Sequence, residues 1–289
     1  LEDGAPDVAA NLQAVSSVSG GSLANAAYVA RRLRPGGATD SACAIPLSQA
    51  VSRDFIQPTI MGLWRPGGRG QAIQRAWEQC PVGLSHVTID TLARRWHDAI
   101  ARGESRPPFP IPLFNSTTLE RNAVVISPLD YRFFAAPFDD EARDTARNQY
   151  RQFESPTWVF YRSGIYHLSD LTGGMSAPLS AAVRASANFP FGFPLVEVQA
   201  RNRLWYSTTM ADRNTPDTAS RMVRLTDGGA LSNSGMWPLV PLLRNQRERI
   251  GDDRGVLMIV VDASRMPGAR TYADMPMTTA SGLLRISLP

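Results

Sequence analysis

The sequence contains no lysine: all 30 basic residues among its 289 positions are arginine, against 26 acidic residues. The phosphate-binding loop of nucleotide hydrolases needs a lysine, so this motif is excluded. The net charge is +4 and the sequence pI about 9.4, but the arginines are scattered, with only short doublets. We therefore expect a solvated surface of mixed charge and no nucleic-acid partner, with an anionic bilayer as the alternative phosphate-rich partner.

Cysteine is almost as scarce, with Cys43 and Cys80 as its two members. They form no CxxC pair, which excludes a cysteine-based zinc site, and we expect neither a metal nor a cofactor. The sequence is compatible both with a disulfide between the two cysteines and with two free thiols. Apolar runs are also short: none reaches the roughly 18 residues of a membrane span, so no transmembrane span is expected in this chain.

Strand-like and helix-like segments alternate, which predicts an α/β sheet with helices on both sides. The proline-rich segment 107–117 favours an edge strand, and the continuous apolar run 255–263 favours a central strand buried on both faces. Residues Leu23, Ala26, Ala27 and Ala30 share one face of a helix at 20–34. Further strands are predicted within 7–18, 122–129, 157–164, 201–209 and 221–229, and further helices at 70–80, 91–103, 177–191 and 234–249.

The stretch SSVSGGS at 16–22 lies between a strand-like and a helix-like run. A nucleophilic serine is exposed by such a tight turn and gains the positive end of the following helix. Ser19 is the better candidate, because it directly follows the strand and Gly20 can offer an unhindered N–H to an oxyanion. Ser22 would fall in the first helical turn, where serine is an ordinary capping residue. A flexible loop or a plain helix cap is the non-catalytic alternative.

The turn also constrains its neighbours, because bulky side chains two positions before and after the nucleophile would collide. Ser17 and Gly21 stand at these two positions around Ser19 and are small enough to support the elbow.

A second candidate stretch, LTDGGALSNSG, begins at residue 225. Asp227 ends a strand there, and Gly228 and Gly229 make a tight turn after it. An ordinary Asp-Gly turn is the bland interpretation. Since open α/β sheets gather their sites at the carboxyl ends of strands, Ser19 and Asp227 could meet at that edge.

Histidine usage limits the mechanism. His86, His97 and His167 are the three histidines, and all precede Asp227, whereas α/β-hydrolases order their triad as serine, acid, histidine. We expect each histidine to be a surface or packing residue. A Ser19–Asp227 dyad remains, in which the carboxylate accepts the serine proton directly. Such a base must be partly desolvated to raise its proton affinity.

At these residues the sequence resembles the patatin-like phospholipases. The stretches that carry the resemblance are SSVSGGS, PLFNSTTLERNAVVIS, AVRASANFPFGFPLVEV and TDGGALSNSG, in the family's order and spacing over about 15–235. The resemblance implies a three-layer α/β/α fold with a mostly parallel central sheet, and hydrolysis of lipid acyl esters without a metal. It assigns Ser19 as nucleophile, Asp227 as base and Gly20 as an oxyanion donor.

The sequence departs from the family pattern at two places. Ser17 stands where the elbow glycine is commonest, and Leu1 lies eighteen residues before Ser19, too close for the family's glycine-rich oxyanion loop. We expect residues 1–289 to form a single patatin-like catalytic domain that lacks its N-terminal strand and this loop. Residues 38–105 are expected to form a helical and irregular insertion, a candidate lid.

The substrate side is less defined. The apolar segment 55–64, with Phe189, Phe191 and Phe193, could line an acyl pocket or a lid, or could make ordinary core and loop packing. An apolar patch edged by arginine would suit a bilayer surface. The expected function is a phospholipase A-type lipid acyl hydrolase acting on phospholipid or another acyl-ester lipid at a membrane surface. A catalytically weak module for membrane or protein binding is the alternative. A bacterial cytoplasmic and a secreted location are both open.

Overall fold

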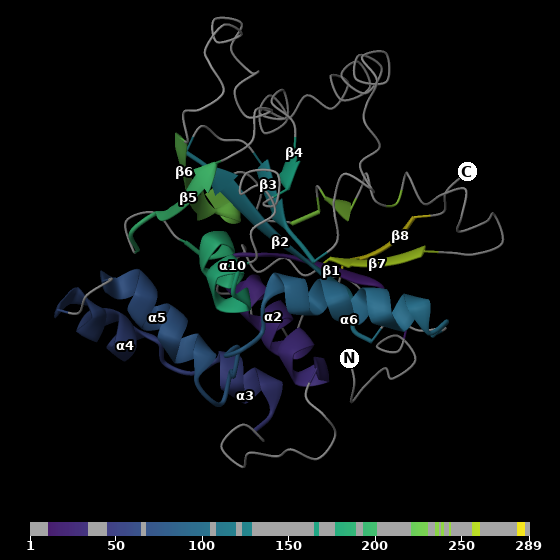
Figure 1. Cartoon of the computed structure of the whole chain (residues 1–289), viewed down its shortest axis with the longest axis horizontal. Helices are drawn as coiled ribbons and strands as arrows, with labels where there is room; N and C mark the ends of the chain where they lie inside the picture. The colour runs from purple at the N-terminus through teal and green to yellow at the C-terminus, as the bar shows by residue number, and fades with distance from the viewer. Residues whose placement is uncertain are drawn as a thin grey trace, which may run out of the picture.

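The structure is a computed structural model, in which the chain folds as a mixed α/β protein (Figure 1). The predicted α/β class is therefore confirmed. The structure describes residues 11–33, 45–64, 68–104, 108–119, 123–128, 165–167, 177–188, 193–200, 221–230, 235–236, 238–239, 243, 256–260 and 282–286. The strands predicted at 157–164 and 201–209, and most of the helix predicted at 234–249, lie outside these residues.

Strand β2 (Ile111–Thr118) runs through the middle of the main sheet. On one edge it pairs antiparallel with β3 (Ala123–Ile126), which in turn pairs parallel with β4 (Ile165–His167). Its other edge is shared by two strands, β1 (Ala14–Val18) and β6 (Arg221–Asp227). The described pairings are therefore mixed in direction, since β1 is parallel to β2 and β6 is antiparallel to it.

The two strands that share this edge point toward each other. β1 ends with Val18 opposite Asn115, and β6 ends with Asp227 opposite Ser116, the next residue of β2. Two strands of opposite direction on one edge of a third strand must bring their carboxyl ends together. β6 also pairs antiparallel with β5 (Val196–Ala200), which holds β6 from its far side.

The prediction that the proline-rich segment forms an edge strand is wrong, because β2 is central. The local reason behind the prediction still applies. Pro112 pairs with Val15 of β1, whereas pairing with β3 begins at Phe114. Proline, which lacks an N–H, thus occupies the part of β2 that has a strand neighbour on one side only among the described residues.

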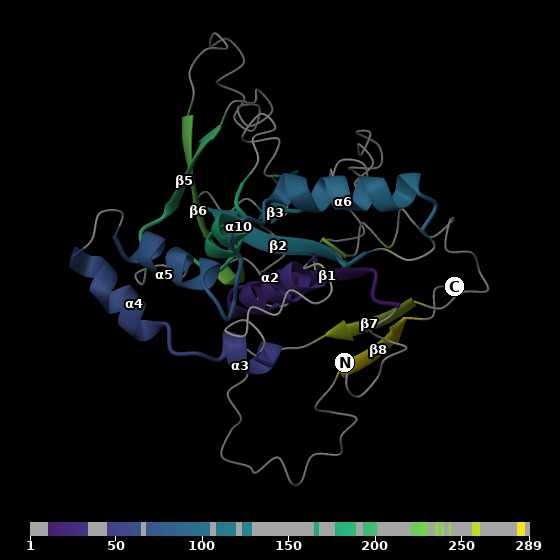
Figure 2. The ribbon, with the colours of Figure 1, turned by 60° about the horizontal axis from the view of Figure 1, so that its bottom comes forward.

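The prediction for the apolar run at 255–263 is also wrong. β7 (Val256–Val260) pairs with β8 (Gly282–Ile286) in a separate two-stranded sheet, which lies beside the main sheet in Figure 2. Met258 is 6% exposed, while Leu257 and Ile259 are 49% and 38% exposed. One face of β7 is thus open to solvent, although its sequence VLMIV shows no polar alternation that would reveal this.

Helices α2 (Gly20–Leu33) and α10 (Leu179–Ser186) pack on β1, β2 and β6 and build much of the core. The apolar face predicted for the helix at 20–34 is confirmed, with small alanines that bring α2 close to the sheet. The buried core residues of these elements include Leu23, Ala26, Ala27, Val29, Ala30, Phe114, Leu179, Ala182, Val183, Val223 and Leu225.

Residues 45–104 form the helices α3 (Leu47–Val51), α4 (Ile56–Met61), α5 (Gly68–Glu78) and α6 (Ile89–Ala101), with a short 3-10 helix, η2 (Gly62–Trp64), after α4. The helices predicted at 70–80 and 91–103 correspond to α5 and α6. Thr88 caps α6 by accepting a hydrogen bond from the Thr91 N–H at 3.1 Å. α4 and α5 lie at one end of the molecule in Figure 1. Of the helices described, none has the length and apolarity to cross a bilayer.

Candidate active site

Ser19 is the one residue between the end of β1 at Val18 and the start of α2 at Gly20. Its backbone has φ = 53°, in the left-handed region that L-residues rarely adopt and that costs on the order of 1–2 kcal/mol. Two backbone hydrogen bonds hold it there: the Ser19 N–H donates to the Ser186 carbonyl at 3.2 Å, and the Ser22 N–H donates to the Ser19 carbonyl at 2.9 Å. The turn leaves Ser19 partly exposed.

The two candidate serines therefore occupy different environments. Ser22 is completely buried, and its hydroxyl lies 2.7 Å from the Ser186 hydroxyl and 3.3 Å from that of Ser17. The Ser22 hydroxyl therefore connects α2 to Ser17 of β1 and Ser186 of α10, and it is not accessible to a substrate. Ser19 is the residue of this stretch whose side chain combines partial exposure with a strained turn.

The small residues around the elbow play unequal parts. The buried Ser17 accepts a hydrogen bond from the Asn25 side-chain amide at 2.9 Å, and so ties β1 to α2. A methyl group added at Gly21 would meet Ser17 Cβ at 4.0 Å, an ordinary contact, and one added at Gly20 would meet nothing within 4 Å. The expected crowding is therefore weak at Gly21, and the space beside Gly20 is open.

Asp227 ends β6 with 3% of its surface exposed. Burial raises the pKa of its carboxyl above the ordinary value, while hydrogen bonds from the Gly229 N–H and the Ser19 side chain act in the opposite direction. The Gly229 N–H reaches Oδ1 at 2.7 Å. Oδ2 is buried and has no hydrogen-bond partner among the described residues. The structure thus brings Ser19 and Asp227 together, and desolvation raises the proton affinity of the carboxylate.

The turn after Asp227 depends on a close backbone approach. Gly228 begins η6 (Gly228–Ala230) directly against β2. A Cβ added at Gly228 would lie 2.3 Å from the Asn115 carbonyl oxygen and 2.9 Å from Val18 Cγ2. Only glycine fits there without moving the strands, so the glycine pair after Asp227 has two separate tasks: Gly228 gives space and Gly229 gives a donor.

A short segment at the end of α10 holds both members of the pair. The Ser186 carbonyl accepts the Ser19 N–H at 3.2 Å, and the Asn188 carbonyl accepts the Asp227 N–H at 3.0 Å. The Ser186 hydroxyl also donates to the Asn115 carbonyl at 2.6 Å. Residues 186–188 therefore fix the nucleophile turn and the carboxylate strand to one another, a role that sequence reasoning missed.

Asn115 and Ser116 are the second group that sequence reasoning missed. They lie on β2 where β1 and β6 meet, and both are essentially buried, at 0% and 1% exposed. The Asn115 amide donates to the Ser17 carbonyl at 2.8 Å, and the Ser116 hydroxyl donates to the Thr226 carbonyl at 2.9 Å. The available signal was a run of four polar residues, 115–118, placed directly after the apolar Leu113 and Phe114.

The remaining predicted residues lie elsewhere or outside the described part. His86 and His97 are exposed, as expected for surface residues, and His167 is on β4 with its side chain not described. Phe193 is partly buried and packs against the core, and its place in an acyl pocket stays a prediction; Phe189 and Phe191 lie outside the described residues.

Metal-binding and redox groups are likewise absent from the described site. No group of three or more His, Cys, Asp or Glu side chains in the described part could hold a metal ion. Cys80, on the turn after α5, is disulfide-bonded, and Cys43 lies outside the described residues.

The arrangement can therefore move a proton. A partly exposed hydroxyl lies against a buried carboxylate of raised pKa, at the N-terminal end of a 14-residue helix. The first N–H groups of that helix have no intrahelical acceptor and carry partial positive charge. Comparison with known family models, curated proteins and solved structures found no match for this chain.

Proposed function

We propose that this chain is a lipid acyl hydrolase that cleaves carboxylic esters through a Ser19–Asp227 dyad and an acyl-enzyme. The observation that carries the proposal is the meeting of a serine at φ = 53° with a buried carboxylate of raised pKa, at the junction of β1 and β6. Strained backbone at a strand-to-helix turn exposes a nucleophile, and a desolvated carboxylate is a stronger base than an exposed one.

In the first half-reaction, Ser19 Oγ attacks the carbonyl carbon of the ester while its proton passes to the Asp227 carboxylate. The oxyanion that develops is stabilised by the N–H of Gly20 and by the positive end of α2. The C–O bond to the alcohol then breaks, and the departing alkoxide takes the proton back from Asp227. An acyl group on Ser19 remains.

In the second half-reaction, a water molecule replaces the alcohol. Asp227 accepts one proton of the water as its oxygen attacks the acyl carbonyl, and returns this proton to Ser19 Oγ as the ester bond to the serine breaks. The carboxylic acid leaves, and both groups regain their starting protonation. No histidine takes part, and neither His86 nor His97 contacts the pair in the described structure.

The substrate class rests on the resemblance to the patatin-like phospholipases, whose elbow and DGG stretches coincide with Ser19 and with Asp227, Gly228 and Gly229. On this basis we infer a phospholipid or related acyl-ester lipid as substrate, and the three-layer α/β/α arrangement of that family for the whole fold. Within the described residues, α2 and α10 pack on each other and on a sheet of mixed strand direction, which supports the α/β part of this inference.

The decisive experiment compares the parent chain with Ser19→Ala on a chromogenic short-chain ester and on a phospholipid in mixed micelles. We expect kcat/KM to fall at least about 10³-fold, because the covalent route disappears. A fluorophosphonate probe should label the parent chain on the tryptic peptide that contains Ser19. Matched controls are Ser85→Ala, which changes an exposed serine in a turn, and the buried Ser22→Ala.

The controls separate catalysis from folding. Ser85→Ala should keep full activity, and Ser22→Ala should lose stability through its hydrogen bonds while keeping probe labelling at residue 19. Unchanged hydrolysis by Ser19→Ala, or labelling of another serine, would refute the dyad. A parent chain that binds lipid without hydrolysing any ester would favour the non-catalytic alternative.

A further inference from the structure

A contiguous apolar surface lies on α4 and η2, away from the Ser19–Asp227 junction. We name it the α4–η2 surface; it consists of five large side chains with high exposed fractions: Ile56 67%, Ile60 48%, Met61 49%, Leu63 55% and Trp64 75%. α4 itself contains no buried residue. Single exposed apolar residues are ordinary, but five within nine positions form a patch of the kind that marks an interaction site.

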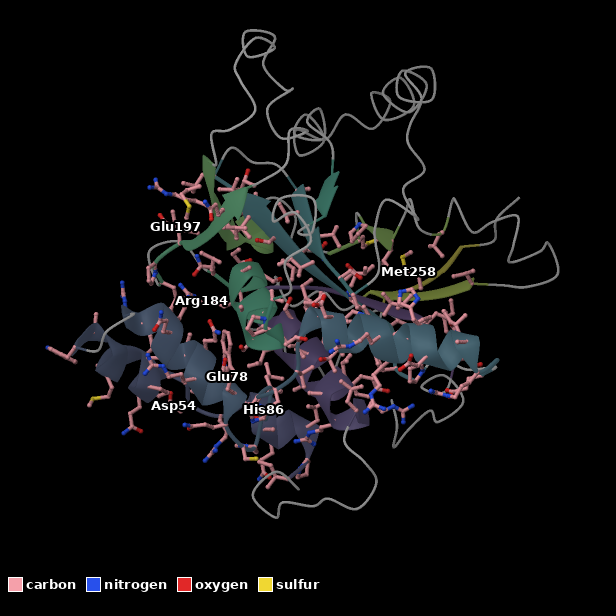
Figure 3. All side chains as sticks on the ribbon, viewed as in Figure 1. Asp54, Glu78, His86, Arg184, Glu197 and Met258 are labelled. Atoms are coloured by element: carbon pink, nitrogen blue, oxygen red, sulfur yellow. The ribbon has the colours of Figure 1, made fainter. Side chains whose placement is uncertain are left out.

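Contacts between residues 55–64 and α5 determine which side chains of this segment face solvent. Gly62 packs so closely on α5 that a Cβ there would lie 2.7 Å from Ala72 Cβ and 2.8 Å from Arg69 Cα. Phe55 meets the Trp77 ring edge-on at 6.4 Å between ring centroids. With a glycine and one aromatic ring as its anchors, the segment turns its other apolar side chains outward, and Figure 3 shows side chains standing out from α4 at this end of the molecule.

For segment 55–64 we expected either an acyl pocket or lid, or ordinary core and loop packing, and its residues now divide between two environments. Phe55 fits the core interpretation, since it packs against the core. The five side chains of the α4–η2 surface face solvent and are not core residues. The acyl pocket and the lid stay predictions.

The charges around the α4–η2 surface indicate what covers it. Between residues 53 and 78 the sequence has four arginines and two acidic residues. Asp54 is exposed and accepts the Ile56 N–H at 2.7 Å at the start of α4, whereas Glu78 is half-buried and accepts the Ser180 hydroxyl at 2.6 Å. Arg53 and Arg75, which precede and follow the apolar residues in the sequence, are exposed. An exposed apolar surface in a segment with an excess of two positive charges is complementary to a surface of apolar chains under negative headgroups.

We propose that the α4–η2 surface docks onto an anionic lipid bilayer. Trp64, the most exposed of the five residues, is of the type that prefers the boundary between headgroups and acyl chains, and arginine pairs with phosphate. α5 packs on α10, whose last residue Ser186 holds the Ser19 turn, so the docking segment and the junction belong to one packed series of helices. This proposal rests on the proposed function, because a lipid hydrolase must reach its substrate in a bilayer. Binding to the bilayer is nevertheless measured separately, in a chain that does not hydrolyse lipid.

The experiment uses the full chain carrying Ser19→Ala, so that vesicles stay intact, and measures co-sedimentation with vesicles of phosphatidylcholine alone and of phosphatidylcholine with phosphatidylglycerol. We expect stronger binding to the anionic vesicles, weakened by salt. Adding Ile60→Ser and Trp64→Ser should lower the partition coefficient at least about tenfold, because two apolar anchors are lost. The matched control is Ile100→Ser, which changes an equally exposed isoleucine (62%) on α6.

Three results would overturn the proposal. The first is absence of binding to anionic vesicles, and the second is an equal loss with Ile100→Ser. The third is a concentration-dependent dimer in ultracentrifugation without lipid that Ile60→Ser and Trp64→Ser abolish, since a second copy would then cover the surface. Hydrolysis of a soluble ester by the chain with native Ser19 is measured separately, so a failure of docking and a failure of the proposed catalysis give different outcomes.

Discussion

The Ser19–Asp227 junction and the α4–η2 surface reverse the usual placement of polar and apolar groups. At the junction, polar side chains such as Asn115, Ser186 and Asp227 are buried at 3% exposure or less and are connected by hydrogen bonds. On the α4–η2 surface, large apolar side chains are between 48% and 75% exposed. Each placement costs free energy in an isolated chain, through desolvation in one case and unburied apolar area in the other.

The comparison teaches where function can be sought in this fold. Buried polar groups are kept where their geometry is needed, and uncovered apolar groups are kept where a partner covers them. Both regions also depend on one glycine that packs against backbone: Gly228 against β2 and Gly62 against α5. These two glycines make it possible to disturb each region separately.

The largest effect is expected from Gly228→Ala. Its Cβ would lie 2.3 Å from the Asn115 carbonyl oxygen, which belongs to the central strand and is held by pairing with β1 and β3. We expect a loss of about 3 kcal/mol or more in the free energy of unfolding, and a fall in kcat of about 100-fold in the molecules that still fold. Chemical denaturation followed by circular dichroism, with ester hydrolysis at matched folded fraction, measures both.

Gly20→Ala is the matched control for this substitution, because it adds the same methyl group on the Ser19 side of the junction where nothing lies within 4 Å. It should change stability by less than about 1 kcal/mol. Equal losses from the two alanines would show that the close approach of Gly228 to β2 does not govern the junction.

Much of the junction could be predicted from sequence because its key signals are local. The stretch at 16–22 and the DGG turn each specify a tight turn after a strand, and the apolar spacing from Leu23 to Ala30 identified the buried face of α2. The meeting of Ser19 and Asp227 was expected from parallel strands in an open sheet. The structure reaches it differently, with β1 and β6 running toward each other along one edge of β2.

The residues that were missed act through long-range register. The backbone carbonyls of Ser186 and Asn188 accept hydrogen bonds from the N–H groups of Ser19 and Asp227. Every residue has a backbone carbonyl, so the residue type does not indicate this role. Asn115 was visible as a polar residue in a strand, but its importance depends on which strands end beside it. The position of β7 in a two-stranded sheet was hidden for the same reason, since its apolar composition does not say which strand it pairs with.

A local effect is expected from Gly62→Ala in the other region. The added methyl group would lie 2.8 Å from Arg69 Cα, so η2 must move away from α5. Because α4 contains no buried residue, we expect the change in global unfolding free energy to stay below about 1 kcal/mol. Hydrogen exchange should accelerate at residues 56–64 and remain unchanged in β2. A global loss as large as that of Gly228→Ala would show that the two regions are not energetically separate.

An effect of opposite sign on stability is expected from Asp227→Asn. Burial raises the folded-state pKa of this carboxyl above its ordinary value of 3.8. The folded protein therefore binds a proton more tightly than the unfolded chain, so stability falls as pH rises through the interval between the two pKa values. Asparagine carries no charge at any pH and can still accept the Gly229 N–H. The variant should therefore melt about 2–4 °C higher than the parent at pH 7.5, while losing ester hydrolysis.

The direction of the Asp227 pKa shift also determines how thermal stability and ester hydrolysis depend on pH. The gain in melting temperature of Asp227→Asn should shrink as the pH falls toward the ordinary value of 3.8, because the folded parent takes up this proton more readily than the unfolded chain. Hydrolysis by the parent needs the ionised carboxylate, so its acid limb should lie above the ordinary range for aspartate. Scanning calorimetry at pH 7.5 and pH 4, with the exposed Asp98→Asn on α6 as the control for loss of one charge, tests this. A lower melting temperature for Asp227→Asn at pH 7.5 would mean that the ionised carboxylate stabilises the junction, and Asp227 would then be a structural anchor that is not tuned as a base.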